Sequence, residues 1–115
     1  MRFPGIALAV AFAVIPALAV AQEMQGMKMG DGDADKAFMK AMQDMQQGMG
    51  AEMSGDADKD FAAMMIPHHQ GAIDMAKIEL QYGKDASLRK LAKAIVGAQE
   101  REIALMKRWQ QKHAK

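Results

Sequence analysis

The 115-residue chain contains no cysteine, few aromatic residues and no excess of charge of either sign. The lack of cysteine excludes disulfide bonds, and it leaves a soft-metal site with only methionine and histidine as ligands. The 15 lysines and arginines nearly balance the 14 aspartates and glutamates and form no basic blocks, so we expect no binding to nucleic acid. In contrast, the chain has 13 methionines, an excess that points first to thioether chemistry.

Residues 1–21 have the features of a secretory signal peptide. Arg2 is followed by an apolar run, and Ala19, Val20 and Ala21 form an A-x-A cleavage site. The run is short for a membrane span, and Pro16 interrupts it. We therefore expect cleavage after Ala21, export to the periplasm or out of the cell, and no membrane attachment of the mature chain. Without Arg2 the mature chain has 14 basic and 14 acidic residues and no net charge.

Residues 22–34 are rich in glycine and aspartate and show no apolar periodicity, which predicts a disordered tail. The tail contains Met24, Met27 and Met29. Thioethers at this spacing can converge on one Cu(I) or Ag(I) ion, or they can be solvated residues without a role. Residues 35–115 are long enough for one small folded domain.

Apolar residues recur at helical spacing in three segments of this domain and predict three helices. The first spans residues 35–53 and is capped by Asp33 or Asp35. The second begins at Asp56 or Asp58 and runs to Tyr82, where Gly83 ends it, and the third begins at Asp85 or Ser87 and runs to Lys112. The sequence therefore predicts an all-α fold.

The first and third of these helices have one apolar face each. That of the first helix consists largely of methionine, with Phe38, Met42, Met45 and Met49. The predicted buried stripe of the third helix, with Glu102 beside it, comprises Leu88, Leu91, Ile95, Gln99, Ile103, Met106 and Trp109. The third helix is longer than the first, so part of its stripe stays uncovered, and we expect a second copy of the chain to cover it in a homodimer.

Residues 64–76, MMIPHHQGAIDMA, carry the strongest chemical signal of the sequence. His68 and His69 each follow a methionine by four residues, Met64 and Met65, so each pair lies on one side of the second helix. Met75 lies two turns after His68. Imidazole and thioether groups are both ligands for copper. The alternative is that these side chains are core residues without a metal.

Two other features of the sequence bear on this segment. Pro67 predicts a kink before the histidines, and Gly71 permits the close approach of a neighbouring helix. Gln99 and Glu102 are polar residues on the apolar stripe of the third helix, and a buried carboxylate needs a partner. The histidines are the natural partners of Glu102. Glu102 could accept a hydrogen bond from an imidazole N–H, or it could bind the same metal ion as the histidines. The alternative is that Glu102 reaches solvent beside a neighbouring arginine.

The segments FAAMMIPHHQGAIDMAKIEL and LAKAIVGAQEREIALMKRW resemble the small exported proteins of the domain-of-unknown-function family numbered 305. The resemblance implies a ferritin-like antiparallel helical bundle and a role in copper binding and tolerance. The matching positions that it implies as copper ligands or their supports are Met64, Met65, His68, His69 and Met75, with Gln99, Glu102 and Met106 opposite. Family members often carry M-H-x-x-M in the first helix, but this chain has Met45 and Met49 with Gln46 in place of the histidine.

Other functions need ligands or groups that the sequence lacks. A di-iron enzyme needs E-x-x-H pairs, and no glutamate here is followed by histidine three residues later. A zinc hydrolase built on the two histidines and Glu102 would leave the methionines unexplained. We therefore expect a non-enzymatic protein that sequesters or transfers Cu(I), with Cu(II) or Ag(I) as further ions and a copper-trafficking protein as partner. The remaining alternative is a methionine-rich module that binds a hydrophobic peptide or partner helix without metal.

Overall fold

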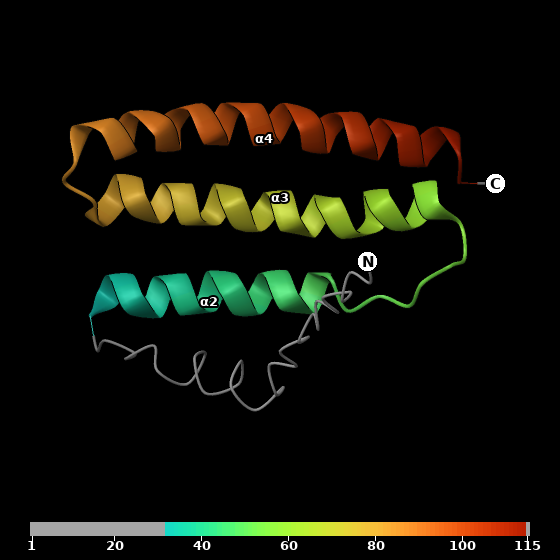
Figure 1. Ribbon diagram of the computed structural model, residues 1–115, viewed down its shortest axis with the longest axis horizontal. Helices are drawn as coiled ribbons and strands as arrows, with labels where there is room; N and C mark the ends of the chain where they lie inside the picture. The colour runs from blue at the N-terminus through green and yellow to red at the C-terminus, as the bar shows by residue number, and fades with distance from the viewer. Residues whose placement is uncertain (1–31, 115) are drawn as a thin grey trace, which may run out of the picture.

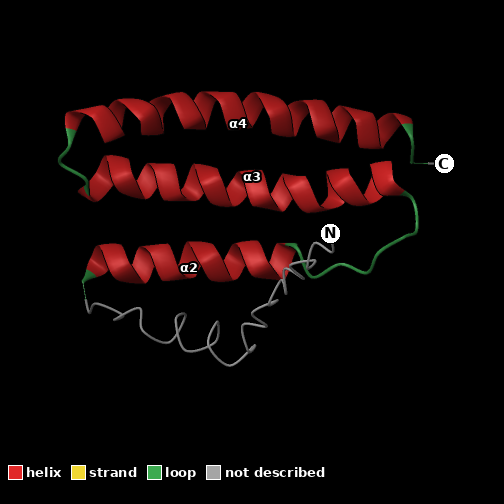
Figure 2. Ribbon diagram, in the orientation of Figure 1, coloured by secondary structure: helices red, strands yellow, loops and turns green. Residues whose placement is uncertain are grey.

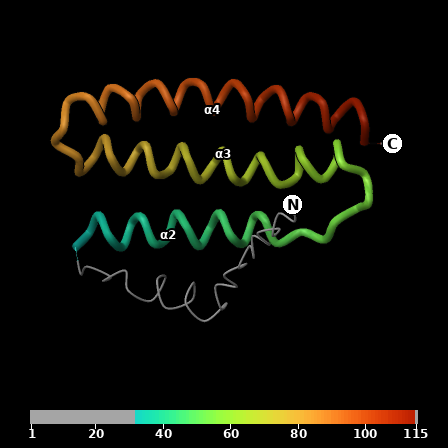
Figure 3. Tube along the Cα trace, viewed as in Figure 1, coloured from blue at the N-terminus to red at the C-terminus, as the bar shows by residue number. Residues whose placement is uncertain are grey.

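The computed structural model describes residues 32–114, and this part of the chain folds into three α-helices and no strand (Figures 1 and 2). They are α2 (Asp33–Gly48), α3 (Ala57–Tyr82) and α4 (Ala86–Lys112). Successive helices run in opposite directions, as the tube in Figure 3 shows. The predicted all-α antiparallel bundle of three main helices is therefore confirmed. The predicted signal peptide and the three methionines of the predicted tail lie outside the described residues.

The three helices lie side by side in a single layer, with α3 in the middle (Figure 1). The helix α3 packs against α2 on one side and α4 on the other, and within residues 32–114 α2 and α4 do not pack against each other. The buried residues of α3 reflect this position. Ala62, His69, Ile73 and Ala76 recur at helical spacing on the side that faces α4, while Gly71 lies on the opposite side, against α2.

The ends of α3 and α4 agree with the sequence prediction because short polar side chains cap both helices. The Asp56 carboxylate accepts hydrogen bonds from the backbone N–H groups of Asp58 and Lys59, at 3.0 and 3.2 Å. The Asp85 carboxylate accepts one from the Leu88 N–H at 2.9 Å. Gly83 follows the last residue of α3. Each cap satisfies backbone donors that have no partner within the helix.

The predicted ends of the first helix are wrong at both termini. The helix α2 begins at Asp33, two residues earlier than predicted, and Gly32 is its N-cap, without a side-chain hydrogen bond. Asp33 and Asp35 lie instead in the first turn, where their negative charge interacts favourably with the helix dipole and stabilises the helix. The helix ends at Gly48, so Met53 lies in the loop rather than in the helix. Glycine at positions 48 and 50 outweighs the methionine spacing, because glycine disfavours helix continuation.

The loop of residues 49–56 is attached to the first turn of α3 through Ser54. Its backbone N–H and its hydroxyl both donate to one carboxylate oxygen of Asp60, each at 2.8 Å. These hydrogen bonds, that of the backbone first, hold the pKa of Asp60 below its ordinary value. The loop therefore returns the chain to α3 in a defined position.

The contact between α2 and α3 depends on two glycines. A Cβ atom on Gly71 would lie 2.8 Å from the Met45 Sδ and 3.1 Å from the Met45 Cβ and Cγ. A Cβ atom on Gly48 would lie 2.6 Å from the Cβ of Pro67. The prediction that Gly71 permits a close helix approach is confirmed. Pro67 itself lies inside α3, which continues on both sides of it.

The buried core of the layer is small and consists mainly of alanine and isoleucine. Buried apolar residues in the described chain include Ala41 of α2, Ile73 and Ile78 of α3, and Ala92 and Ile103 of α4. The predicted buried stripe of α4 is wrong at its N-terminal end, because Leu88 and Leu91 are both 54% exposed. Among the helices of residues 32–114, none covers that part of the stripe.

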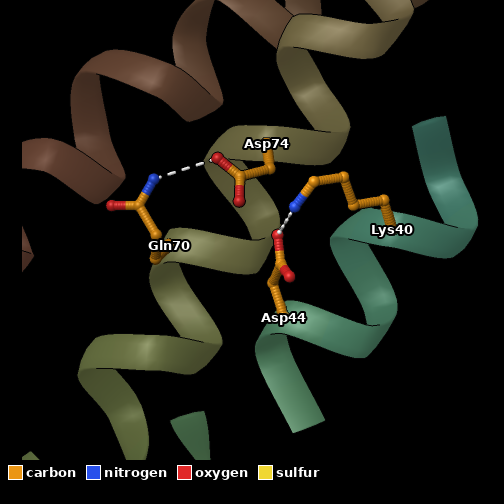
Figure 4. Close-up of polar contacts among 4 residues, drawn as sticks. All are labelled: Lys40, Asp44, Gln70 and Asp74. Carbon is orange, nitrogen blue, oxygen red and sulfur yellow. Dashed lines mark hydrogen bonds and ion pairs between the residues drawn. The ribbon is translucent and has the colours of Figure 1, made fainter. Parts of the chain in front are cut away.

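The two surfaces of the layer differ in polarity. On one surface Lys40 and Asp44 of α2 form an ion pair at 2.7 Å beside Gln70 and Asp74 of α3, which are joined by a 3.0 Å hydrogen bond (Figure 4). Asp44, and more weakly Asp74, raises the pKa of Lys40.

Among the helices described, none is long and apolar enough to cross a membrane.

Candidate metal centre

His69 lies at the contact between α3 and α4 and is only 8% exposed. Its Nε2 contacts the Oε2 of Glu102 on α4. The Glu102 side chain is 57% exposed, so it reaches solvent, as one of the two alternatives from the sequence has it, and it also has the expected histidine partner from the second helix. A half-solvated carboxylate costs little to keep charged, and it holds the buried imidazole in one orientation.

The other ring nitrogen of His69, Nδ1, is buried and has no hydrogen-bond partner in the described structure. If Nε2 carries the proton and donates it to Glu102, Nδ1 keeps a free lone pair. A buried polar atom without a partner costs about 1–3 kcal/mol. A metal ion bound at Nδ1 would relieve this cost, and a carboxylate that accepts from the other nitrogen is the usual support of a metal-bound histidine. The residues present therefore fit a metal at this position.

His68 and the neighbouring methionines supply further candidate ligands near His69. The rings of His68 and His69 are 6.3 Å apart between centroids, and His68 is exposed. Met65 lies one turn before His69 on the same side of α3, and Met64 has the same relation to His68. Both methionines are half-buried. Within one described chain, the nearest candidate set is therefore the two histidines with these two thioethers, with Glu102 opposite.

The other predicted ligands occupy several parts of the layer. Met75 is two turns beyond the histidines and lines a hollow with Phe38 of α2, and Met106 lines a second hollow at the other end of the layer. Gln99 is half-buried, one turn before Glu102. Met45 packs on Gly71, and Met49 is exposed at the end of α2. The polar and ring contacts of His69 are with Glu102 and His68 and involve none of these five.

The ligand chemistry of this region is dominated by sulfur. Within residues 32–114 no group of three or more histidine, cysteine, aspartate or glutamate side chains is placed to hold a metal ion. A site with three or more protein ligands here therefore needs a further type of donor, and the neighbouring thioethers offer one. Mixed imidazole and thioether sets suit copper, whereas carboxylate-rich sets suit harder ions.

The two hollows contain residues that the sequence did not single out as functional. Phe61 and Leu105 line the hollow at the Trp109 end and are 57% and 61% exposed. Both hollows open on the same side of the layer. Leu88 and Leu91 of one hollow are each 18 residues from Met106 and Trp109 of the other, or about five turns of α4. The predicted stripe of the third helix already contains these four residues, whereas Phe61 and Leu105 were not part of any predicted stripe.

Comparison with known proteins identifies the family of this chain. A search of curated proteins gives no match. The family model described as Domain of unknown function (DUF305) matches residues 11–110, which include all of α2 and α3 and nearly all of α4. A match over most of the chain identifies its family, so the resemblance of the MIPHHQGA segment is confirmed: the chain belongs to the DUF305 family.

Proposed function

We propose that this chain is an exported, non-enzymatic copper-binding protein that sequesters copper or passes it to a copper-trafficking partner. The observation that supports this most directly is His69, whose Nε2 contacts Glu102 while its Nδ1 is buried without a partner. An imidazole held in this way keeps one lone pair free for a metal ion.

The choice of copper rests on the ligand types around His69. Cysteine is absent, and the nearest side chains of suitable chemistry are a second imidazole and thioethers. Thioethers favour Cu(I), and imidazoles accept either oxidation state of copper. We therefore propose Cu(I) as the principal ion, with Cu(II) and Ag(I) bound at the same histidines.

The test is an anaerobic Cu(I) titration against a chromophoric competing chelator. We expect His69→Ala, and the double change His68→Ala with His69→Ala, to weaken the tightest site by more than about 100-fold. This exceeds the roughly 10–100-fold cost of removing a residue that only supports a ligand. Circular dichroism should show retained helices, because alanine is the best helix former.

His113 provides a matched control on the same chain. It lies just after α4, its Nδ1 contacts the Trp109 carbonyl at 2.7 Å, and its ring stacks on Trp109. His113→Ala should leave the tight site unchanged. Equal effects of His113→Ala and His69→Ala, or an unchanged affinity in the double variant, would contradict the proposal.

A second candidate function is a methionine-rich module that binds a hydrophobic peptide or a partner helix without metal. The exposed apolar residues Phe61, Leu91 and Leu105 favour it, because adaptable apolar surfaces suit such partners. The same titration separates the two functions. If the unchanged protein binds Cu(I) no more tightly than the His68→Ala and His69→Ala double variant does, the result would favour the metal-free interaction module.

A further inference from the structure

One surface of the three-helix layer has an apolar hollow at each of its two ends. We call it the apolar face. At one end it includes Phe61, Leu105 and Trp109, and at the other Leu91, Met75 and Phe38, so all three helices contribute. Large apolar side chains on it are about half-exposed in the single chain. An exposed contiguous patch of this kind marks an interaction surface.

The opposite surface has the character of a surface in contact with water. Figure 4 shows its charged and polar side chains on α2 and α3. On α3 the exposed residues Lys59, Gln70 and Lys77 continue it at helical spacing. The layer is thus amphipathic as a whole. Water solvates its polar surface, whereas the helices of residues 32–114 leave the apolar side chains of the other surface uncovered.

We infer that a second copy of this chain covers the apolar face, in a twofold dimer with the two layers face to face. The face has the size that such a contact needs. The helices α3 and α4, with 26 and 27 residues, are about 40 Å long, and three helices spaced about 8–10 Å apart span about 20 Å between outer axes. Because α2, with 16 residues, is only about 24 Å long, the resulting area is about 600 Å², near the lower limit of what one partner contributes to a stable interface.

The width of the face favours a second layer over a single helix. One added helix would cover the middle of the face and leave apolar residues of either α2 or α4 exposed. A second layer covers α2, α3 and α4 together, and twofold symmetry makes the same patch serve both copies.

The charges at the ends of the face also suit a second copy. Asp58, Arg108 and Lys112 border the hollow at the Trp109 end, and Glu79 borders the hollow at the Leu91 end. If the Trp109 ends of the two copies meet, Asp58 of each copy can pair with Arg108 or Lys112 of the other. If the Trp109 end of one copy meets the Leu91 end of the other, Glu79 can pair with these cations instead. Within each hollow, apolar residues are bordered by these charged side chains, as the apolar parts of protein interfaces are.

The dimer has a consequence for the histidine segment. Since α3 is the middle helix of the layer, its outward-facing residues lie at the centre of the interface in either orientation. Met65, His68 and Met75 share this side of α3 with Phe61 and Ala72, as their helical spacing shows. The second copy would thus enclose side chains that a single chain leaves open.

The test measures the mass of the purified chain, processed as the cell processes it, by sedimentation in metal-free buffer up to tens of micromolar. We expect a dimer. Leu105→Glu should weaken it by more than about tenfold, because symmetry places the new charge against an apolar hollow of the interface twice. Leu105 is 61% exposed in the single chain, so its replacement leaves the layer itself intact.

Ala104→Glu is the matched control, with the same charge added at the adjacent exposed position of α4, on the other side of the helix. It should leave the dimer unchanged. Because the chain has no cysteine, Ala72→Cys also gives a unique thiol on the apolar face, which a short bis-maleimide should cross-link between copies, whereas Ala104→Cys should not cross-link. Monomer at all concentrations, or a dimer weakened by Ala104→Glu and not by Leu105→Glu, would overturn the inference. Since the buffer contains no metal, this result is independent of the copper proposal.

Discussion

At the scale of single residues, His69 is the position where packing and chemistry meet. A histidine that served only the core would have both ring nitrogens hydrogen-bonded, as buried polar groups normally are. Here Nε2 has Glu102, and Nδ1 has no partner although it is buried. The half-exposed Glu102 can keep its charge, so it can hold the Nε2 proton and leave the Nδ1 lone pair free.

Glu102 should therefore act on copper through the orientation of His69. We expect Glu102→Ala to weaken the tightest Cu(I) site by about 10–100-fold, and Glu102→Gln to weaken it less, since the amide oxygen can still accept from Nε2. Proton NMR of the imidazole should show the tautomer shifting toward Nδ1–H in the alanine variant, which simple loss of packing would not produce.

Glu100 is exposed on the same helix, two residues earlier, and Glu100→Gln is the control for the loss of one negative charge. A weakening by Glu100→Gln as large as that by Glu102→Gln would indicate a general charge effect. In that case the orienting role of Glu102 would be wrong.

At the scale of helices, α2 is attached to the rest of the layer through contacts that tolerate no added methyl group. Gly71 faces Met45, and Gly48 faces the rigid ring of Pro67. Gly97 of α4 differs, because an added Cβ would meet only the end of the Arg101 side chain, at 3.5 Å. Replacement by alanine should therefore lower the stability of the fold at Gly71 and raise it at Gly97.

Gly71→Ala should destabilise the fold by on the order of 1 kcal/mol. Overpacking costs about 1–3 kcal/mol, and alanine returns up to about 1 kcal/mol through helix propensity. The Met45 Sδ can move aside, but its Cβ is fixed to the α2 backbone, so the helix itself must shift. Gly97→Ala should stabilise by about 0.5–1 kcal/mol. Urea unfolding at one protein concentration measures both, and a stabilising Gly71→Ala would contradict the tight α2–α3 contact.

The helices also show which features a sequence can predict. The caps at Asp56 and Asp85 fixed the starts of α3 and α4, because a side-chain acceptor at a helix start acts locally. The end of α2 was missed because methionine spacing continues past Gly48. Periodicity identified the apolar side of α4 but not its burial, since burial depends on what covers Leu88 and Leu91.

The candidate site was predictable only in part for the same reason. The spacing of residues 64–76 identified both histidines, and the stripe of α4 identified Glu102. Which histidine faces α4 depends on how the two helices are aligned, and no local pattern encodes this. The separation of Met75 and Met106 from His69 likewise follows from the three-dimensional arrangement.

At the scale of the whole molecule, the fold is one helix thick, so it buries little apolar surface of its own. The buried residues of the described chain are mostly small, and none of the large side chains is fully enclosed. A structure of this kind gains much of its stability from what binds to it, because any ligand that prefers the folded state stabilises that state. A second copy on the apolar face and copper at His69 are two such ligands.

Copper should therefore raise the melting temperature of the protein strongly. At a free Cu(I) concentration 100 times the dissociation constant, binding adds about 2.7 kcal/mol, which corresponds to roughly 10–20 °C for a small domain. Anaerobic thermal unfolding followed by circular dichroism, with Cu(I) buffered by a weak chelator, measures the shift. The shift should disappear in His68→Ala with His69→Ala and persist in His113→Ala and after removal of residues 22–31, a deletion that leaves the Gly32 cap of α2 in place. A shift that survives the double histidine change but is lost on removal of residues 22–31 would place the principal site at the methionines of the predicted tail instead. The reason is that a bound ion raises the melting temperature only when the folded chain forms the site.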